Sequence, residues 1–146
     1  MPRRRYKASR PMRETIRPFT FTVDNMIKIK RVYEKPDIGD GYRILVDRLW
    51  PRGLTNDEVK ADLWLKEISP SNSLRAWFGH TPKLWPGFKR KYFKELEAKK
   101  DLLEFIIKKA RTENVTLLYG AKDEKQNNAV ALKEYMELFA KKTTVS

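Results

Sequence analysis

Residues 43–53 read RILVDRLWPRG. The first four, Arg43–Val46, form a continuous run of mostly apolar and β-branched side chains, which is typical of a strand buried on both faces. A loop containing proline and glycine follows at once, and Thr55 with Glu58 then forms the pattern of a capping box at the start of a helix. A buried strand that passes through a polar loop into a helix is the repeating unit of layered α/β domains.

The rest of the chain alternates strands and helices in the same way. Alternation at Ile27–Lys30 and apolar runs at 63–65 and 115–119 predict three more strands. We predict further helices at 88–97, 101–112 and roughly 124–141, and place the core face of the middle one at Leu102, Phe105, Ile106 and Ala110. The prediction is an α/β fold, a single compact layered domain with a short, mainly parallel sheet of about four strands flanked by helices.

The first strand is the exception in this pattern. Its connection to the strand at 43–46 is short for a parallel crossover, which usually needs about a dozen residues or more. We therefore expect the strand at 27–30 to pair antiparallel or to lie at an edge of the sheet.

Composition limits the possible chemistry. The chain has 146 residues, of which 40% are apolar and 12% aromatic, so it can bury a sizeable core. It has no cysteine and a single histidine, His80, which excludes disulfides, thiolate metal sites and multi-histidine metal centres. We expect neither a metal nor a cofactor. No apolar run approaches the roughly 18 residues of a membrane span, and no signal peptide is evident, so we expect a cytoplasmic protein without a membrane partner.

The charge is strongly positive, with 32 basic and 19 acidic side chains. Residues 1–25 hold seven of the basic and two of the acidic groups, and prolines interrupt any periodicity there. We predict that residues 1–25 are a basic flexible extension and that residues 26–146 are a single α/β domain. The extension is interpreted either as a phosphate-gripping arm or as disordered sequence outside the native domain, such as an upstream start. Its arginine-rich, acid-poor composition also resembles an organelle transit peptide. The domain keeps an excess of eight positive charges by itself.

The loop after the strand at 43–46 carries the first candidate site residues. Ligands of open α/β sheets bind at the carboxyl ends of the strands, where Asp47, Arg48, Trp50 and Arg52 stand. Both arginines suit phosphate or carboxylate, Trp50 suits a ligand ring, and Asp47 is a candidate catalytic residue that the arginines should keep ionised. The alternative is structural, with Asp47 in a salt bridge and Trp50 packed in the core.

The loop after the last strand carries the second set. Lys122, Asn127 and Asn128 are candidate ligand-binding residues, and Asp123 is a candidate for proton transfer. Each also has a structural interpretation. Asp123 resembles a helix N-cap with Gln126 three residues on, and asparagines in a first helical turn are usually exposed to solvent.

His80 is the third candidate catalytic residue. It precedes Thr81 and Pro82, which read as a helix start, so we expect Gly79 and His80 to form the turn before that helix. A histidine there suits general acid–base chemistry near neutral pH, although a lone histidine is more often a structural hydrogen-bond partner.

Four motifs stand in order along the chain, GYRILVDRLWPRG at 41–53, LWLKEISPS at 63–71, WFGH at 77–80, and LLYGAKD at 117–123 followed by NNA at 127–129. They resemble the YeaO-like family, domain-of-unknown-function group 488, over about residues 27–139. The resemblance implies a small prokaryotic cytosolic α/β protein with no established reaction. The motif positions that carry over are Asp47, Arg48, Trp50, Arg52, Trp77, Gly79, His80, Asp123 and Asn127 or Asn128. The chain departs from the family pattern at Trp85–Gly87, where we expect the helix to kink or to start late.

Two functional hypotheses follow. The first is a pocket for a small anionic ligand, such as a nucleotide or a phosphorylated metabolite, with or without Asp/His/Arg catalysis. It requires the candidate side chains to meet in one concavity at the strand ends. The alternative is a basic nucleic-acid-binding module, suggested by the charged segment 89–94 and by four tryptophans. A third interpretation is a domain that only binds another protein. The sequence specifies neither the ligand nor the oligomeric state.

Overall fold

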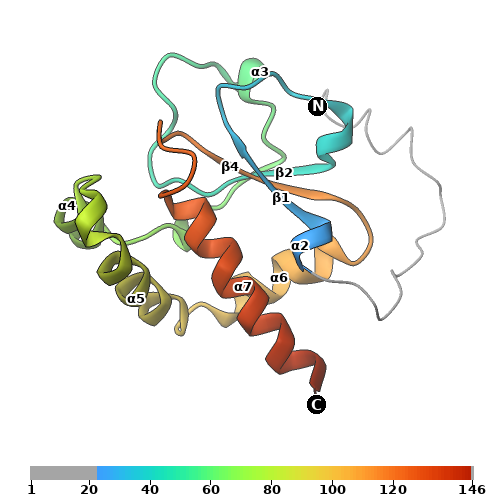
Figure 1. The fold of residues 1–146 in the computed structure, drawn as a ribbon. Helices are drawn as coiled ribbons and strands as arrows, with labels where there is room; N and C mark the ends of the chain where they lie inside the picture. The colour runs from blue at the N-terminus through green and yellow to red at the C-terminus, as the bar shows by residue number, and fades with distance from the viewer. Residues whose placement is uncertain (1–22, 146) are drawn as a thin grey trace.

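The structure is a computed structural model that describes residues 23–145. In these residues the chain forms a four-stranded parallel sheet in the order β1-β4-β2-β3 (Figure 1). The strands are β1 (Ile27–Arg31), β2 (Tyr42–Leu45), β3 (Leu63–Trp64) and β4 (Val115–Tyr119). The predicted α/β fold is confirmed.

Helices join and cover these strands. The α-helices are α2 (Val23–Met26), α3 (Asn56–Val59), α4 (Asn72–Phe78), α5 (Trp85–Leu96), α6 (Lys100–Ala110) and α7 (Asn128–Val145). Three short 3₁₀ turns lie between them, η2 (Ile38–Asp40), η3 (Lys66–Ile68) and η4 (Pro82–Leu84). In Figure 1, α7 crosses the molecule with α4 and α5 on one side and α6 on the other.

The two faces of the sheet bury different amounts of apolar surface. Along β2, Ile44 packs into a large core shared with the helices, whereas Leu45 packs into a small cluster with Trp50 and Trp64 beside it. Along β4, Leu117 packs into the large core and Leu118 packs into the small cluster. Successive side chains of a strand point to opposite faces, so a strand covered on both faces needs an unbroken apolar run.

β1 lies at the edge of the sheet, which was one of the two expectations for this strand. The other expectation, antiparallel pairing, is wrong. β4 inserts between β1 and β2 and pairs with both in parallel. The short connection at 32–41 therefore joins strands that are not neighbours, and it crosses the sheet through η2 rather than through a long helix. The carbonyl of Asp40 accepts a hydrogen bond of 2.7 Å from Thr116 Oγ1 of β4 beneath it.

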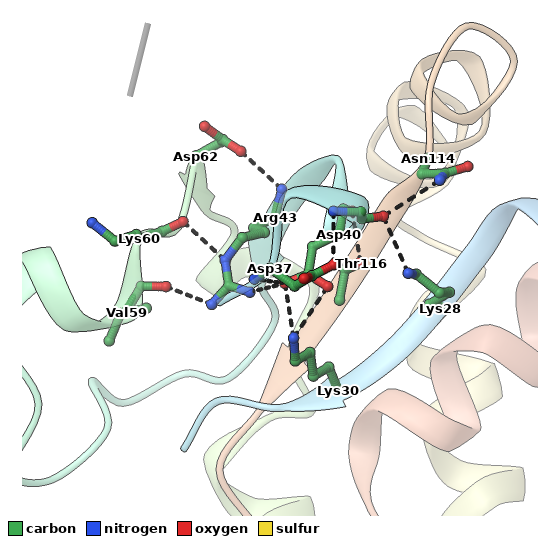
Figure 2. Close-up of polar contacts among 11 residues, drawn as sticks. Lys28, Lys30, Asp37, Asp40, Arg43, Val59, Lys60, Asp62, Asn114 and Thr116 are labelled. Atoms are coloured by element: carbon green, nitrogen blue, oxygen red, sulfur yellow. Dashed lines mark hydrogen bonds and ion pairs between the residues drawn. The ribbon is translucent and has the colours of Figure 1, made fainter. Parts of the chain in front are cut away.

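A group of charged side chains fills the space under this crossover (Figure 2). We call Lys30, Asp40 and Arg43 the amino-end cluster. Arg43 is fully buried, and its guanidinium pairs with Asp40 and donates to the carbonyls of Val59 (2.6 Å) and Lys60 (3.0 Å). The Lys30 Nζ lies 3.0 Å from Asp40 Oδ2. Burial alone would raise the pKa of Asp40, but its bonds to Lys30 and to backbone and the nearby cations outweigh burial and lower that pKa.

The buried face of α6 differs from the prediction. Leu103, Ile106, Ile107 and Ala110 are its buried residues, whereas Phe105 is 41% exposed. The helix packs against β4, α2 and α7 together, and this broad contact shifts the covered face toward Leu103 and Ile107. In α5 the helix begins at Trp85, with Pro86 in the first turn, where a missing N–H breaks no helical hydrogen bond.

Most of the predicted extension lies outside the described residues. Of residues 1–25, only 23–25 are described, and Val23 is 3% exposed within the large core. Within residues 23–145, no helix combines the length and the apolar character that crossing a membrane requires.

Candidate ligand-binding cavity

A cavity of about 680 Å³ opens at the carboxyl ends of the parallel strands. Most of its wall comes from three segments, the loop after β2 at 47–52, the segment from 69 to 80 that includes α4, and the loop after β4 at 120–128, and Tyr33 and Phe88 complete it. Of the nine candidate site residues, those that line it are Asp47, Arg48, Trp50, Arg52, His80, Asn127 and Asn128. Lys122 and Asp123 are not among its lining residues.

Asp47 is the carboxylate of this cavity. Its Oδ2 accepts a 2.9 Å hydrogen bond from the backbone N–H of Gly120, and its Oδ1 accepts a 3.0 Å bond from Nδ2 of Asn128. Burial raises the pKa of Asp47, although both hydrogen bonds and the charge of Arg75 act in the opposite direction. We expected the neighbouring arginines to hold Asp47 ionised; instead, within residues 23–145, Asp47 makes no ion pair.

Gly120 makes this contact possible. A Cβ on Gly120 would lie 3.1 Å from Asp47 Oδ2, closer than side-chain atoms normally approach a neighbour. A larger residue at this position would separate the β4 backbone from the carboxylate. The group that approaches Gly120 is therefore the carboxylate of Asp47.

Three arginines line the cavity, one more than the sequence suggested. Arg48 Nε reaches the carbonyl of Pro70 at 3.4 Å, and Arg75 Nη1 donates to Asn72 Oδ1 at 3.0 Å. The guanidinium of Arg52 makes no hydrogen bond or ion pair with any other described residue, and its backbone carbonyl accepts from Tyr33. No sequence pattern singles out Arg75, because its position depends on how α4 packs beside the sheet.

Trp50 is held in place by the protein. Its Nε1 donates to the carbonyl of Leu54 at 2.7 Å, and its ring meets Trp64 edge-on at 5.3 Å between centroids. Trp64 in turn donates to the carbonyl of Asp47 at 2.8 Å. The packed role of Trp50 is therefore present, and the ring also forms part of the cavity wall.

The two asparagines point inward and bond to the protein. Asn127 Oδ1 accepts from the N–H of Val130 at 3.0 Å, which makes Asn127 the N-cap of α7. The helix start that we predicted at 124 is wrong, because Asp123 instead accepts from the N–H groups two and three residues on (2.8 and 3.0 Å) and closes a separate turn. Asn128 joins α7 to the end of β2, since its Nδ2 also reaches the carbonyl of Val46 at 3.1 Å.

His80 lies in the turn between α4 and η4, where the sequence predicted it. Gly79 (φ 49°) and His80 (φ 57°) both adopt the left-handed conformation. The side chain of His80 is exposed and lines the cavity beside Phe78, with 5.9 Å between the ring centroids. Backbone hydrogen bonds lower the pKa of Asp123, and the charge of His80 adds to that effect.

The described part of the chain contains no group of three or more His, Cys, Asp or Glu side chains arranged to hold a metal ion. The polar side chains that line the cavity are three guanidiniums, one carboxyl group, one imidazole, four amides, the indole of Trp50 and the hydroxyls of Tyr33 and Ser69.

Comparison with known proteins identifies the family of this chain. A family model described as the inactive DUF488-N3 subclade matches residues 26–144. The chain belongs to the DUF488 family. This match confirms the family resemblance that the four motifs indicated. The matched residues include every segment that lines the cavity.

Individual relatives agree with the DUF488 assignment. The chain is 40% identical over 110 residues to the uncharacterized protein YeaO of Escherichia coli K12, an alignment that covers 75% of this chain and 96% of YeaO. It is 38% identical over 81 residues to the uncharacterized protein Rv3073c of Mycobacterium tuberculosis and to Mb3100c of Mycobacterium bovis, covering 56% of this chain and 69% of each relative. No solved structure matches.

Proposed function

We propose that the cavity binds a small anionic ligand through Arg48, Arg52 and Arg75. The observation that carries this proposal is Arg52, a guanidinium on the cavity wall with no bonding partner among residues 23–145. A guanidinium presents a planar fork of donors that fits phosphate or carboxylate in two parallel hydrogen bonds. An anion that bridges the cavity would complete those bonds.

The electrostatic balance of the cavity supports an anion. Three guanidiniums face one carboxyl group, and both oxygens of that carboxyl already accept hydrogen bonds from Gly120 and Asn128. Burial raises the pKa of Asp47, so the cavity disfavours the charged form of the one carboxyl group in its lining. The charged side chains of the lining are therefore mostly cations.

The size and lining of the cavity favour a ligand that also has an apolar part. A volume of about 680 Å³ lies within the roughly 300–1,000 Å³ of typical ligand sites. Apolar wall is supplied by Trp50, Phe78 and Phe88. A nucleotide or a phosphorylated metabolite combines an anion with such a part.

We favour binding without chemical turnover. The family model that matches this chain is described as inactive, which supports a binding role over a catalytic one. Asp47 and His80 line the cavity and would position the ligand, whereas Asp123 would act only by supporting the loop after β4.

A thermal-shift titration of the full chain tests this proposal. The probes are inorganic phosphate, pyrophosphate and adenosine monophosphate, and the variants are Arg52→Ala and Lys108→Ala. Lys108 is an exposed cation on α6 that does not line the cavity, so both variants lose one positive charge. A probe at 100 times its Kd should stabilise the wild type by about 2.7 kcal/mol.

We expect Lys108→Ala to keep this shift and Arg52→Ala to lose most of it. The proposal is wrong if no probe shifts the wild type, or if both variants respond equally.

A further inference from the structure

The segment from α4 to the end of α5 is unusually basic. Residues 72–96 contain six Lys or Arg side chains and one acidic side chain, Glu95. Glu95 is already engaged, since its two carboxylate oxygens accept from the N–H and the hydroxyl of Ser71 at 2.9 and 2.6 Å. By contrast, α6 carries three basic and two acidic side chains. The positive excess is therefore concentrated in the α4–α5 segment.

Four residues of α5 form one solvent-facing stripe. Gly87, Arg90, Lys91 and Lys94 stand at helical positions i, i+3, i+4 and i+7, which share one face of a helix. The opposite face holds Phe88, Tyr92 and Leu96, all buried in the core. Arg90, Lys91 and Lys94 are exposed. Lys89 is not part of the stripe, because its Nζ pairs with Glu134 of α7 at 3.1 Å.

Trp77 of α4 lies against this stripe and remains 42% exposed. The Lys91 ammonium lies 5.0 Å from the centre of its indole ring. A Cβ on Gly87 would stand 3.0 Å from the ring edge, so glycine gives the indole room against α5. A large exposed aromatic ring among cations combines a stacking platform with phosphate-binding groups.

α4 and α5 follow one another along the chain as a helical hairpin, so we call the surface formed by Trp77, Arg90, Lys91 and Lys94 the hairpin face. We propose that the hairpin face binds single-stranded nucleic acid. The cations would contact successive phosphates, and Trp77 would stack on an unpaired base. A duplex has no base face free for Trp77, so the single strand is the better fit. None of these four residues lines the cavity, so the site is separate from the one proposed above.

Fluorescence anisotropy with a labelled oligothymidylate tests the hairpin face, using the full chain. The test variant is Arg90→Glu with Lys91→Glu, and the control is Lys100→Glu with Lys108→Glu on α6. All four positions are exposed, and each double variant changes the net charge by the same amount. Residues 1–25 are identical in both, so any contribution from that basic segment cancels in the comparison.

We expect the hairpin variant to bind at least about tenfold more weakly than the α6 control, and wild-type affinity to fall steeply with added salt. Equal losses in the two variants would overturn the proposal, as would the absence of binding at low salt. Both variants should keep the phosphate-induced thermal shift of the wild type, which separates failure here from failure of the cavity proposal.

Two substitutions of Trp77 test the stacking contact. Trp77→Phe keeps an aromatic ring, whereas Trp77→Leu keeps only apolar bulk. We expect Trp77→Leu to weaken oligothymidylate binding about fivefold or more and Trp77→Phe to weaken it less, with duplex DNA showing no such difference. Equal affinities of the two variants for the single strand would contradict the assignment of Trp77. If the wild type bound anionic lipid vesicles or an acidic protein more tightly than the oligonucleotide, the proposal of a nucleic-acid partner would be wrong.

Discussion

The two ends of β2 carry the same types of charged side chain in opposite arrangements. At the amino end, Asp40 and Arg43 pair with each other, and the remaining donors of Arg43 reach backbone carbonyls. At the carboxyl end, Asp47 bonds to neutral donors, and the guanidinium of Arg52 makes no bond with another described residue. One end is closed by its own charges, whereas the other leaves cations beside a cavity.

This difference shows how a structural ion pair can be told from a binding group. Buried charges that satisfy one another fix the crossover at 32–41 and leave nothing for a ligand. The pKa values follow the same division, since that of Asp40 is lowered and that of Asp47 is raised. The sequence shows an aspartate near an arginine at both ends and does not distinguish them.

Breaking the amino-end cluster should have the largest effect on stability. Arg43→Met removes a fully buried cation, leaving the carbonyls of Val59 and Lys60 without their donor and Asp40 with Lys30 as its remaining ion-pair partner. We expect the free energy of unfolding in urea to fall by about 3–5 kcal/mol. Arg52→Met is the matched control, and its effect should stay within about 0.5 kcal/mol. Similar losses in the two variants would mean that the two ends do not differ as described.

Asp40→Asn should cost about 2 kcal/mol near neutral pH, because a hydrogen-bonded charge is lost beside Lys30 and Arg43. The pKa of Asp40 is lowered on folding, so its carboxylate stabilises the fold fully above 3.8 and loses that contribution as the pH falls through the folded-state pKa. Urea midpoints of the wild type and Asp40→Asn should therefore converge below that pH. A difference that is constant down to strongly acidic pH would contradict this.

Removing the α7 cap should have a moderate effect. Asn127→Ala deletes the acceptor for the N–H of Val130, and we expect a loss of about 1 kcal/mol, seen as a lower Tm. Asn56→Ala, at an exposed position of α3, is the control and should change stability by no more than about 0.5 kcal/mol. If Asn127→Ala leaves Tm unchanged, α7 does not depend on this cap.

Asp47→Asn should have the smallest effect, within about 1 kcal/mol near neutral pH, since burial disfavours the charge that the substitution removes. Its pH dependence should have the opposite sign to that of Asp40. The pKa of Asp47 is raised on folding, so the wild type gains stability relative to Asp47→Asn as the pH falls through the folded-state pKa toward 3.8. A wild type that loses stability against Asp47→Asn in that range would show that Asp47 is held ionised after all.

The sequence predicted the features that depend on local pattern. The limits of β4, the Thr55 capping box and the turn at His80 all follow from side-chain periodicity and turn chemistry. Placing the loop after β2 at a cavity needed only the rule that ligands meet parallel strands at their carboxyl ends.

Features that depend on long-range packing were not predictable in this way. The pairing of β1 depends on β4, which lies far along the chain, and the buried face of α6 depends on three neighbouring elements. Arg75 enters the cavity only because α4 packs beside the loop after β2. The start of α7 was misplaced because Asp123 and Asn127 are both good caps, and only the tertiary contacts of Asn128 decide between them.

The central position of β4 also governs the order in which the protein can fold. Ile27 of β1 pairs with Val115, and Tyr42 of β2 pairs with the same residue, so β1 and β2 have no common partner until that part of the chain has been synthesised. Contacts between residues so distant in sequence slow folding, because a long loop must close before they form. Until β4 arrives, the nascent chain therefore carries β1 without a partner strand and β2 with only β3 beside it, and the sheet is completed when β4 inserts between β1 and β2.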